Sequence, residues 1–108
     1  MMLQRLSRVH SVAVTASLAT TGQIPYHDMS GGRVHIPAGS SITSLTWYDA
    51  TDLGGTFLAA YDSAATPAAI TQTVSAEKSY PIPVDLFGAR VLKVVGNAAG
   101  TVTISLKG

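Results

Sequence analysis

A period-two alternation of aliphatic and polar residues is the feature that most constrains the fold of this chain. In Thr101–Lys107 every second residue from Val102 onward is aliphatic, and the residues between them are Ser, Thr or Lys. Ser11–Leu18 alternates in the same way, with Val, Val, Ala and Leu at the even positions. Successive side chains of a strand point to opposite faces, so both segments are predicted to be strands with one buried face.

Further strand-like segments recur along the chain, separated by turn-forming residues. They are Arg33–Ile36, Ser41–Tyr48, Thr56–Tyr61, Ile70–Val74 and Ala89–Val95. The glycine-containing stretch Asp52–Gly55 predicts a hairpin between the second and third of these segments. Ala89–Val95 is apolar on both faces, as a central strand requires. Two prolines in Tyr80–Pro83 remove hydrogen-bond donors, so this stretch is predicted at a sheet edge or in a connection.

These patterns predict an all-β fold, a single-domain antiparallel β-sandwich or jelly roll of seven or eight short strands. The expected boundaries are an N-terminal arm over residues 1–10 and a sandwich domain over residues 11–108. No internal repeat, linker or second domain is visible in the sequence.

The N-terminal segment is the one part of the chain with helix-like spacing. Leu3, Leu6 and Val9 are three residues apart, and Arg5 and Arg8 lie between them. Two turns are too short to stay helical in water, so any order must come from contacts with the sandwich or a neighbouring subunit. The candidate assembly contacts are therefore Leu3, Arg5, Leu6, Arg8 and Val9. Deleting residues 1–9 is expected to leave the sandwich folded and to weaken assembly.

Composition narrows the possible functions. Charged residues make up only 12% of the 108 residues and the net charge is +1. That share is well below the usual one of about 25%, and the scattered Lys and Arg predict no nucleic-acid partner. No apolar run approaches the ~20 residues of a membrane span, and a targeting peptide ending near Ala19 is disfavoured because Ser and Thr interrupt its apolar region. With 23 Ser and Thr in total, the surface is expected to be uncharged and easily desolvated.

No set of residues forms a recognisable catalytic or metal-binding motif. His27, Asp28 and His35 are the one cluster that resembles a site, and nothing nearby supplies the further ligands that metal sites normally need. There is no nucleophile elbow, no phosphate-binding glycine motif and no cysteine. We therefore predict a non-enzymatic protein with no catalytic residues, no metal and no cofactor.

The aromatic residues allow two interpretations. Trp47 alternates in phase with Leu45, which predicts a core position with Phe57 as its cross-strand partner. In the alternative, the rings form a platform for a carbohydrate. The residues of that platform would be Tyr26, Trp47, Tyr48, Tyr61 and Tyr80. The feature that separates the two is whether the tyrosines gather on one open face.

Three stretches resemble the small β-sandwich proteins that decorate or cement the capsids of tailed bacteriophages. They are Pro37–Tyr48, Leu86–Val95 and Gly100–Lys107. The resemblance is one of general character from Arg33 onward, with no invariant motif. It implies a virion structural protein at the capsid surface that forms a homo-oligomer, a trimer or dimer, and binds the major capsid protein of a phage head. The alternative is a carbohydrate- or receptor-binding module of a phage tail or fibre.

Overall fold

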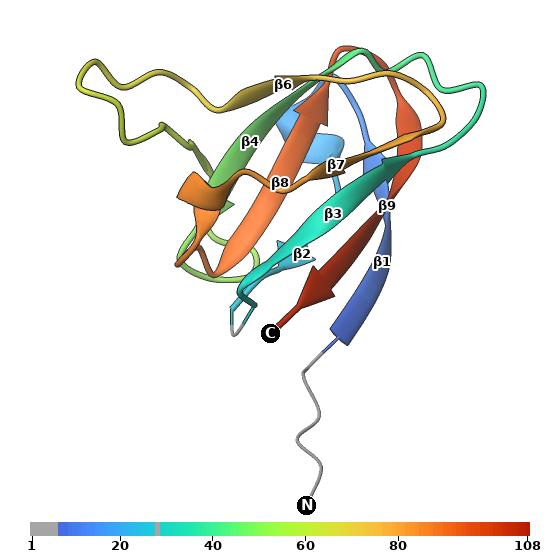
Figure 1. Cartoon of the computed structure of the whole chain (residues 1–108). Helices are drawn as coiled ribbons and strands as arrows, with labels where there is room; N and C mark the ends of the chain where they lie inside the picture. The colour runs from blue at the N-terminus through green and yellow to red at the C-terminus, as the bar shows by residue number, and fades with distance from the viewer. Residues whose placement is uncertain (1–6, 28) are drawn as a thin grey trace, which may run out of the picture.

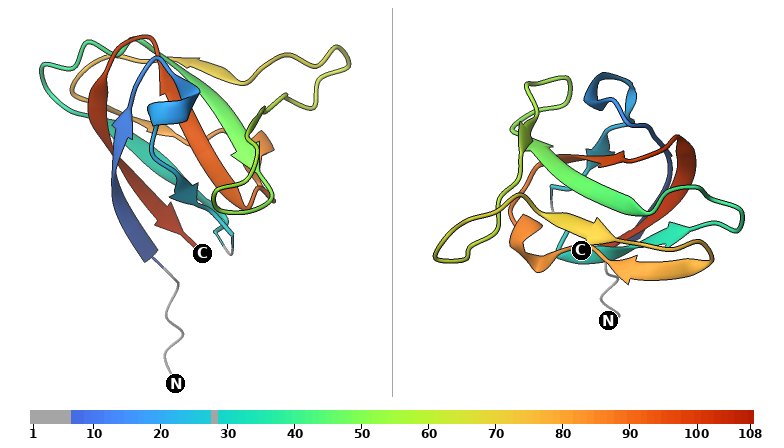
Figure 2. Two further views of the ribbon diagram at one scale, coloured as in Figure 1. Left: turned by 180° about the vertical axis from the view of Figure 1, so that it is seen from behind. Right: turned by 90° about the horizontal axis from the view of Figure 1, so that it is seen from above.

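The protein is a sandwich of two antiparallel sheets (Figures 1 and 2), seen in a computed structural model that describes residues 7–27 and 29–108. The first sheet has the order β1-β9-β3-β7. Its strands are β1 (Ser7–Val14), β9 (Gly100–Lys107), β3 (Gly31–Ile36) and β7 (Lys78–Pro81). The expected all-β sandwich is confirmed, with nine strands in place of seven or eight.

The second sheet has the order β2-β8-β4-β5, and β6 also pairs with β4. Its strands are β2 (Ile24–Pro25), β8 (Val91–Gly96), β4 (Ser44–Ala50), β5 (Leu58–Ala59) and β6 (Thr71–Thr73). Two short 3-10 helices, η1 (Leu18–Thr20) and η2 (Val84–Leu86), are the helical elements of the described residues. In that same part of the chain, no helix is long and apolar enough to cross a membrane.

Strand alternation places the predicted aliphatic residues between the sheets. Val102, Ile104 and Leu106 of β9 are all buried, and β9 lies between β1 and β3. β8 lies between β2 and β4 and is the central strand that its apolar sequence predicts. β7 is an edge strand that ends at Pro81, as the prolines require.

The first strand begins earlier than its sequence pattern indicates. β1 pairs with β9 from Ser7 onward, so residues 7–10, which the sequence assigns to the arm, extend the sheet. Arg8 and Val9 are therefore in a strand and not in a helix, because the eight residues Ser7–Val14 all pair with residues of β9. Leu3, Arg5 and Leu6 lie outside the described residues. At the other end, Leu18 leaves the strand to start η1.

Trp47 is the largest fully buried side chain, as predicted. It is 0% exposed, and its indole Nε1 donates a hydrogen bond of 2.8 Å to Oε1 of Gln72. Its backbone bonds to the residue after β5 and to the residue before β6, since Trp47 O accepts from Ala60 N at 3.0 Å and Trp47 N donates to Ile70 O at 3.0 Å.

The predicted partner of Trp47 is wrong, because the register of the hairpin puts Phe57 elsewhere. Tyr48 faces Ala59 and Asp49 faces Leu58, so Phe57 lies just before the start of β5 and has no partner position opposite Trp47. Its ring lies on the outer side of the second sheet, with Nζ of Lys93 4.8 Å from the ring centroid. Lys93 also donates to Leu18 O at 2.9 Å, so η1 and the loop before β5 cover this outer face together (Figure 2, right).

The burial of Trp47 predicts a large loss of stability on truncation. Trp47→Ala should lower the free energy of unfolding by about 3–5 kcal/mol, because it empties the middle of the core and leaves Gln72 without its donor. Urea unfolding followed by circular dichroism measures the loss. Gln72→Ala is the comparison variant and should cost about 1–3 kcal/mol, because it leaves the buried indole N–H without its acceptor and removes the bond from Gln72 Nε2 to Pro81 O. A Trp47→Ala protein as stable as the parent would show that the indole is not part of the core.

Two adjacent glycines at the start of β3 give a sharp test of the contact between β3 and β9. A methyl group on Gly32 would overlap the carbonyl oxygen of Ser105 and lie 3.1 Å from Cα of Leu106, whereas one on Gly31 meets nothing within 4 Å. Gly32→Ala should therefore destabilise the protein by about 1–3 kcal/mol, as overpacking does. Gly31→Ala is the control and should leave the thermal midpoint unchanged or slightly raised. Equal midpoints for both variants would contradict the close approach of these strands.

Candidate interaction surfaces

The outward side of the first sheet carries many short hydroxyl side chains, and we call it the hydroxyl face. Alternation along β1, β9, β3 and β7 sends every second side chain away from the core. Its residues are Ser7, Val9, Ser11, Ala13, Thr101, Thr103, Ser105, Lys107, Arg33, His35 and Ser79. Such a surface loses little hydration energy when another protein covers it, because hydroxyl and methyl groups cost far less to bury than ions.

The charged groups of the hydroxyl face lie on its two central strands, with Arg33 of β3 opposite Ser105 and Lys107 at the end of β9. Arg33 is held in place by Ser79, since its Nε donates to Ser79 Oγ at 2.8 Å and an Nη atom donates to Ser79 O at 3.0 Å. Next to Arg33, a hollow of 410 Å³ lies between Ser30 and Lys107. The centre of the face, on β9, consists of Thr103 and Ser105.

A second surface is the rim around Phe87, where the chain turns from η2 towards β8. Leu86 is buried and anchors the turn, Phe87 N donates to Val84 O at 3.1 Å, and Ala89 N donates to Leu86 O at 3.0 Å. Gly88 has φ of 96°, a conformation open to glycine and strained for other residues. The turn therefore holds the Phe87 ring outside the core, where it is 69% exposed.

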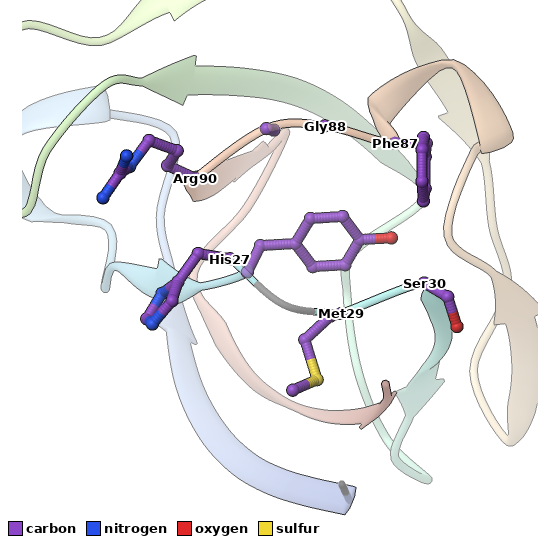
Figure 3. Close-up of a pocket in the computed structure, with 8 residues that line it drawn as sticks. His27, Met29, Ser30, Phe87, Gly88 and Arg90 are labelled. Carbon is purple, nitrogen blue, oxygen red and sulfur yellow. The ribbon is translucent and has the colours of Figure 1, made fainter. Parts of the chain in front are cut away.

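One hollow beside Phe87 has a volume of 460 Å³, and His27 and Arg90 are among the residues that line it (Figure 3). His27 and Arg90 lie on one side of it and Ser30 and Phe87 on the other, with Met29 between. The backbone fixes this arrangement, because Arg90 O accepts hydrogen bonds from the amides of Tyr26 and His27 at 2.8 and 3.0 Å.

The hollow on the other side of Phe87 has a volume of 440 Å³ and combines apolar and acidic groups. Leu58 and Tyr61, which are 67% and 59% exposed, line it with Phe87. Asp49 and Asp85 lie in the same hollow, and Asp85 Oδ1 accepts a hydrogen bond from Ser63 at 3.0 Å. Two rings beside two carboxylates form a surface that suits a polar ligand with an apolar face.

The predicted assembly contacts are only partly placed by the structure. Arg8 and Val9 lie on β1 and point to opposite sides of the first sheet. Val9 is on the hydroxyl face and 66% exposed, while Arg8 is half-buried on the inward side. Leu58, Val84 and Phe87 of the rim are exposed hydrophobic residues that the sequence analysis missed, because in a sequence they resemble core residues.

The structure does not bring together the described members of the cluster that resembles a site in the sequence. His27 lies in the rim hollow, His35 lies on the hydroxyl face, and Asp28 is outside the described part. Among the side chains that the structure describes, no three His, Cys, Asp or Glu residues are grouped as metal ligands would be. The geometry therefore assigns the two histidines to different surfaces.

The aromatic residues do not share one open face. Trp47 and Tyr26 are buried in the core. The hydroxyl of Tyr80 is tied to the loop before it, accepting a hydrogen bond from Ser75 N at 2.8 Å. Tyr48 lies on the outer face of the second sheet, and Tyr61 is the exposed tyrosine in the hollow that Phe87 shares with Leu58.

Comparison with known proteins gives one informative likeness. No protein-family model matches the sequence, and no curated protein matches it. Among solved structures, the crystal structure of the SPBc2 prophage-derived protein YomS superposes with a TM-score of 0.60. The alignment covers 100% of this chain and 98% of YomS at 14% sequence identity, so the two proteins share a fold along their whole length.

The buried phenol of Tyr26 predicts a loss of stability at high pH. Desolvation raises the pKa of Tyr26 above its ordinary value of 10.0, because burial disfavours the phenolate. The unfolded chain releases this proton at its ordinary pKa and the folded chain does so at higher pH, so the stabilisation is full below pH 10 and falls as the pH rises above it.

Urea unfolding between pH 8 and 11 measures this effect against Tyr26→Phe. The parent protein should lose more stability across this interval than Tyr26→Phe, which cannot ionise at this position. Parallel pH profiles for the two proteins would contradict burial of the phenol.

Proposed function

We propose that this chain is a non-enzymatic structural protein of a bacteriophage virion, and specifically a capsid decoration or cement protein. In this proposal it self-associates at the capsid surface and binds the major capsid protein of the phage head. The observation that carries the proposal is the whole-length likeness in fold to a prophage-derived protein. The capsid assignment adds the resemblance of Pro37–Tyr48 and Leu86–Val95 to decoration proteins.

The hydroxyl face supports a role in assembly. A protein that covers a shell needs a broad, flat surface that can be desolvated over a large area. Thr103 and Ser105 supply uncharged hydroxyl groups on the central strand β9, where they lie opposite His35 and Arg33 of β3. We therefore assign the contact with the capsid to this face.

The second candidate function is a carbohydrate- or receptor-binding module of a phage tail or fibre. The observation that favours it is the hollow in which Tyr61 and Phe87 lie with Asp49 and Asp85. Aromatic rings pack on the apolar faces of sugars, and carboxylates accept hydrogen bonds from hydroxyl groups. This function would use the rim and leave the hydroxyl face free.

Co-sedimentation with phage heads that lack the protein separates the two functions. Thr103→Arg places a long charged side chain in the middle of the hydroxyl face and should reduce head binding at least about tenfold, because a buried unpaired charge costs several kcal/mol. Phe87→Ala changes the rim and should bind heads like the parent. Both variants should keep the thermal midpoint of the parent within a few degrees, since both positions are at the surface.

Two results would contradict the capsid assignment. The first is a parent protein that does not sediment with heads at any concentration tested. The second is a Phe87→Ala variant that loses binding to immobilised host glycans, while Thr103→Arg retains it. Deleting residues 1–6 tests the arm separately and should weaken head binding without unfolding the sandwich. This deletion ends before Ser7 and is shorter than the deletion of residues 1–9 considered from the sequence, because residues 7–9 belong to β1.

A further inference from the structure

The four edges of the two sheets differ in how well they are protected against pairing with another strand. β7 has four residues and ends at Pro81. β2 has two residues, one of them Pro25, and the opposite edge of the second sheet consists of β5, with two residues, and β6, with three. β1 is eight residues long and contains no proline. Short strands and prolines are common protections of an exposed edge, so β1 is the unprotected edge of the sandwich.

The direction of the backbone groups on β1 follows from the hydrogen bonds at its end. Ala13 O accepts from Gly22 N at 3.0 Å, so the backbone of Ala13 faces away from β9. In an antiparallel strand, every second residue directs both its N–H and its C=O to the same side. Ser7, Val9 and Ser11 therefore present their backbone groups at the open edge. Ser30 N donates to Lys107 O on the far side of β9 at 2.7 Å, which fits this register.

This open stretch has no backbone partner within the described part of the chain. Gly22 covers the edge at Ala13, and Gly96 N donates to Thr15 O just beyond β1. Between Ser7 and Ser11, the hydrogen bonds of β1 are those made to β9. The side chains at the edge positions are uncharged, because Arg8 and His10 point inward. No charge on the open edge therefore opposes the approach of a second strand.

We propose that β1 pairs antiparallel with β1 of a second copy of this chain, about a two-fold axis at Val9. In this register Val9 faces Val9 of the other copy, and Ser7 faces Ser11. The edge is its own complement, because the two serines are symmetric about Val9 and each edge donor meets an acceptor. The exposed Val9 side chains then cover each other on the hydroxyl face, and the two first sheets join into one sheet of eight strands. This pairing would be the contact through which the chain self-associates in the proposed function. It does not require a capsid.

Sedimentation velocity of the purified protein, in the absence of phage particles, tests the pairing. The parent chain should form dimers. Val9→Pro removes an edge donor from each copy and leaves the β1–β9 ladder intact, since the N–H of Val9 faces outward. This variant should weaken dimerisation at least about tenfold. Val9→Thr retains the donor and a similar shape, so it is the matched control and should dimerise like the parent.

Cysteine substitution tests the register without depending on the stability of the proline variant. The chain contains no cysteine. At Val9 the two Cα atoms would be about 5.5 Å apart, within the range that a disulfide spans. At Ser11 they would be separated by four residue steps along the strand, roughly 13 Å, which no disulfide bridges. Mild oxidation should therefore give covalent dimers with Val9→Cys and monomers with Ser11→Cys.

Three outcomes would overturn the inference. They are a parent protein that remains monomeric at about 100 μM, a Val9→Pro variant that is folded and dimerises normally, and equal crosslinking at the two cysteine positions. If Val9→Pro does not fold, the cysteine pair decides. Head binding by a monomeric parent would support the capsid function while refuting this dimer, so the two proposals can fail independently.

Discussion

The packing of Trp47 between the two sheets is the interaction on which the rest of the structure depends. Its side chain fills the centre of the core, and its backbone bonds to Ala60 on one neighbouring segment and Ile70 on another. The indole N–H would be costly to bury without an acceptor, and Gln72 of β6 supplies one. One residue of β4 thus determines where both β5 and β6 can lie. With β4 fixed in this way, β8 places its own aliphatic residues against the first sheet.

The two candidate interaction surfaces follow from the way the sandwich keeps polar side chains out of its core. Alternation puts the aliphatic residues inside and leaves Ser and Thr outside on the first sheet. The second sheet is partly covered on its outer face by η1, by the residues after it and by the loop containing Gly54, and Gly54 N donates a hydrogen bond of 2.7 Å to Oε1 of Gln23. Thr71 and Thr73 of β6 remain exposed on that face. The remaining apolar exposure lies at the rim, where Leu86 anchors a turn too tight to bring Phe87 inside. The hydroxyl face and this rim are two surfaces that are open to a partner.

The sequence was informative where a periodic pattern and a burial requirement agree. Alternation in β9, the apolar character of β8 and the prolines of β7 each predicted the position of a strand in its sheet. Hairpin register could not be obtained in this way, because the residues after Gly55 contain no signal that distinguishes Phe57 from Ala59 as the partner of β4. The start of β1 was hidden for a related reason. Arg8 and His10 occupy inward positions near the end of the sandwich, where polar side chains interrupt the aliphatic pattern.

The candidate surfaces were harder to predict than the fold. A sequence shows that Val9 and Phe87 are hydrophobic, but their exposure depends on tertiary features. Val9 is exposed because the outer side of β1 has no covering layer among the described residues, and Phe87 because Gly88 turns the chain. The tyrosines are the opposite case. Their number in the sequence suggested a binding platform, but the topology places them in separate regions of the protein. Surface chemistry in this chain is set by which side of a strand or turn a residue occupies.

The bonds around Trp47 also have a consequence for how the chain tolerates change in length. Ala60 and Ile70 are held next to each other, since Ile70 N donates to Ala60 O at 2.8 Å, while the residues between them extend away from the sheets. The two ends of this loop are held by these backbone hydrogen bonds. The entropic cost of closing a loop rises only slowly with the number of residues in it. Foreign peptides inserted near Ala65 would therefore leave the core pairings in place. The loop is therefore a natural position for an inserted epitope.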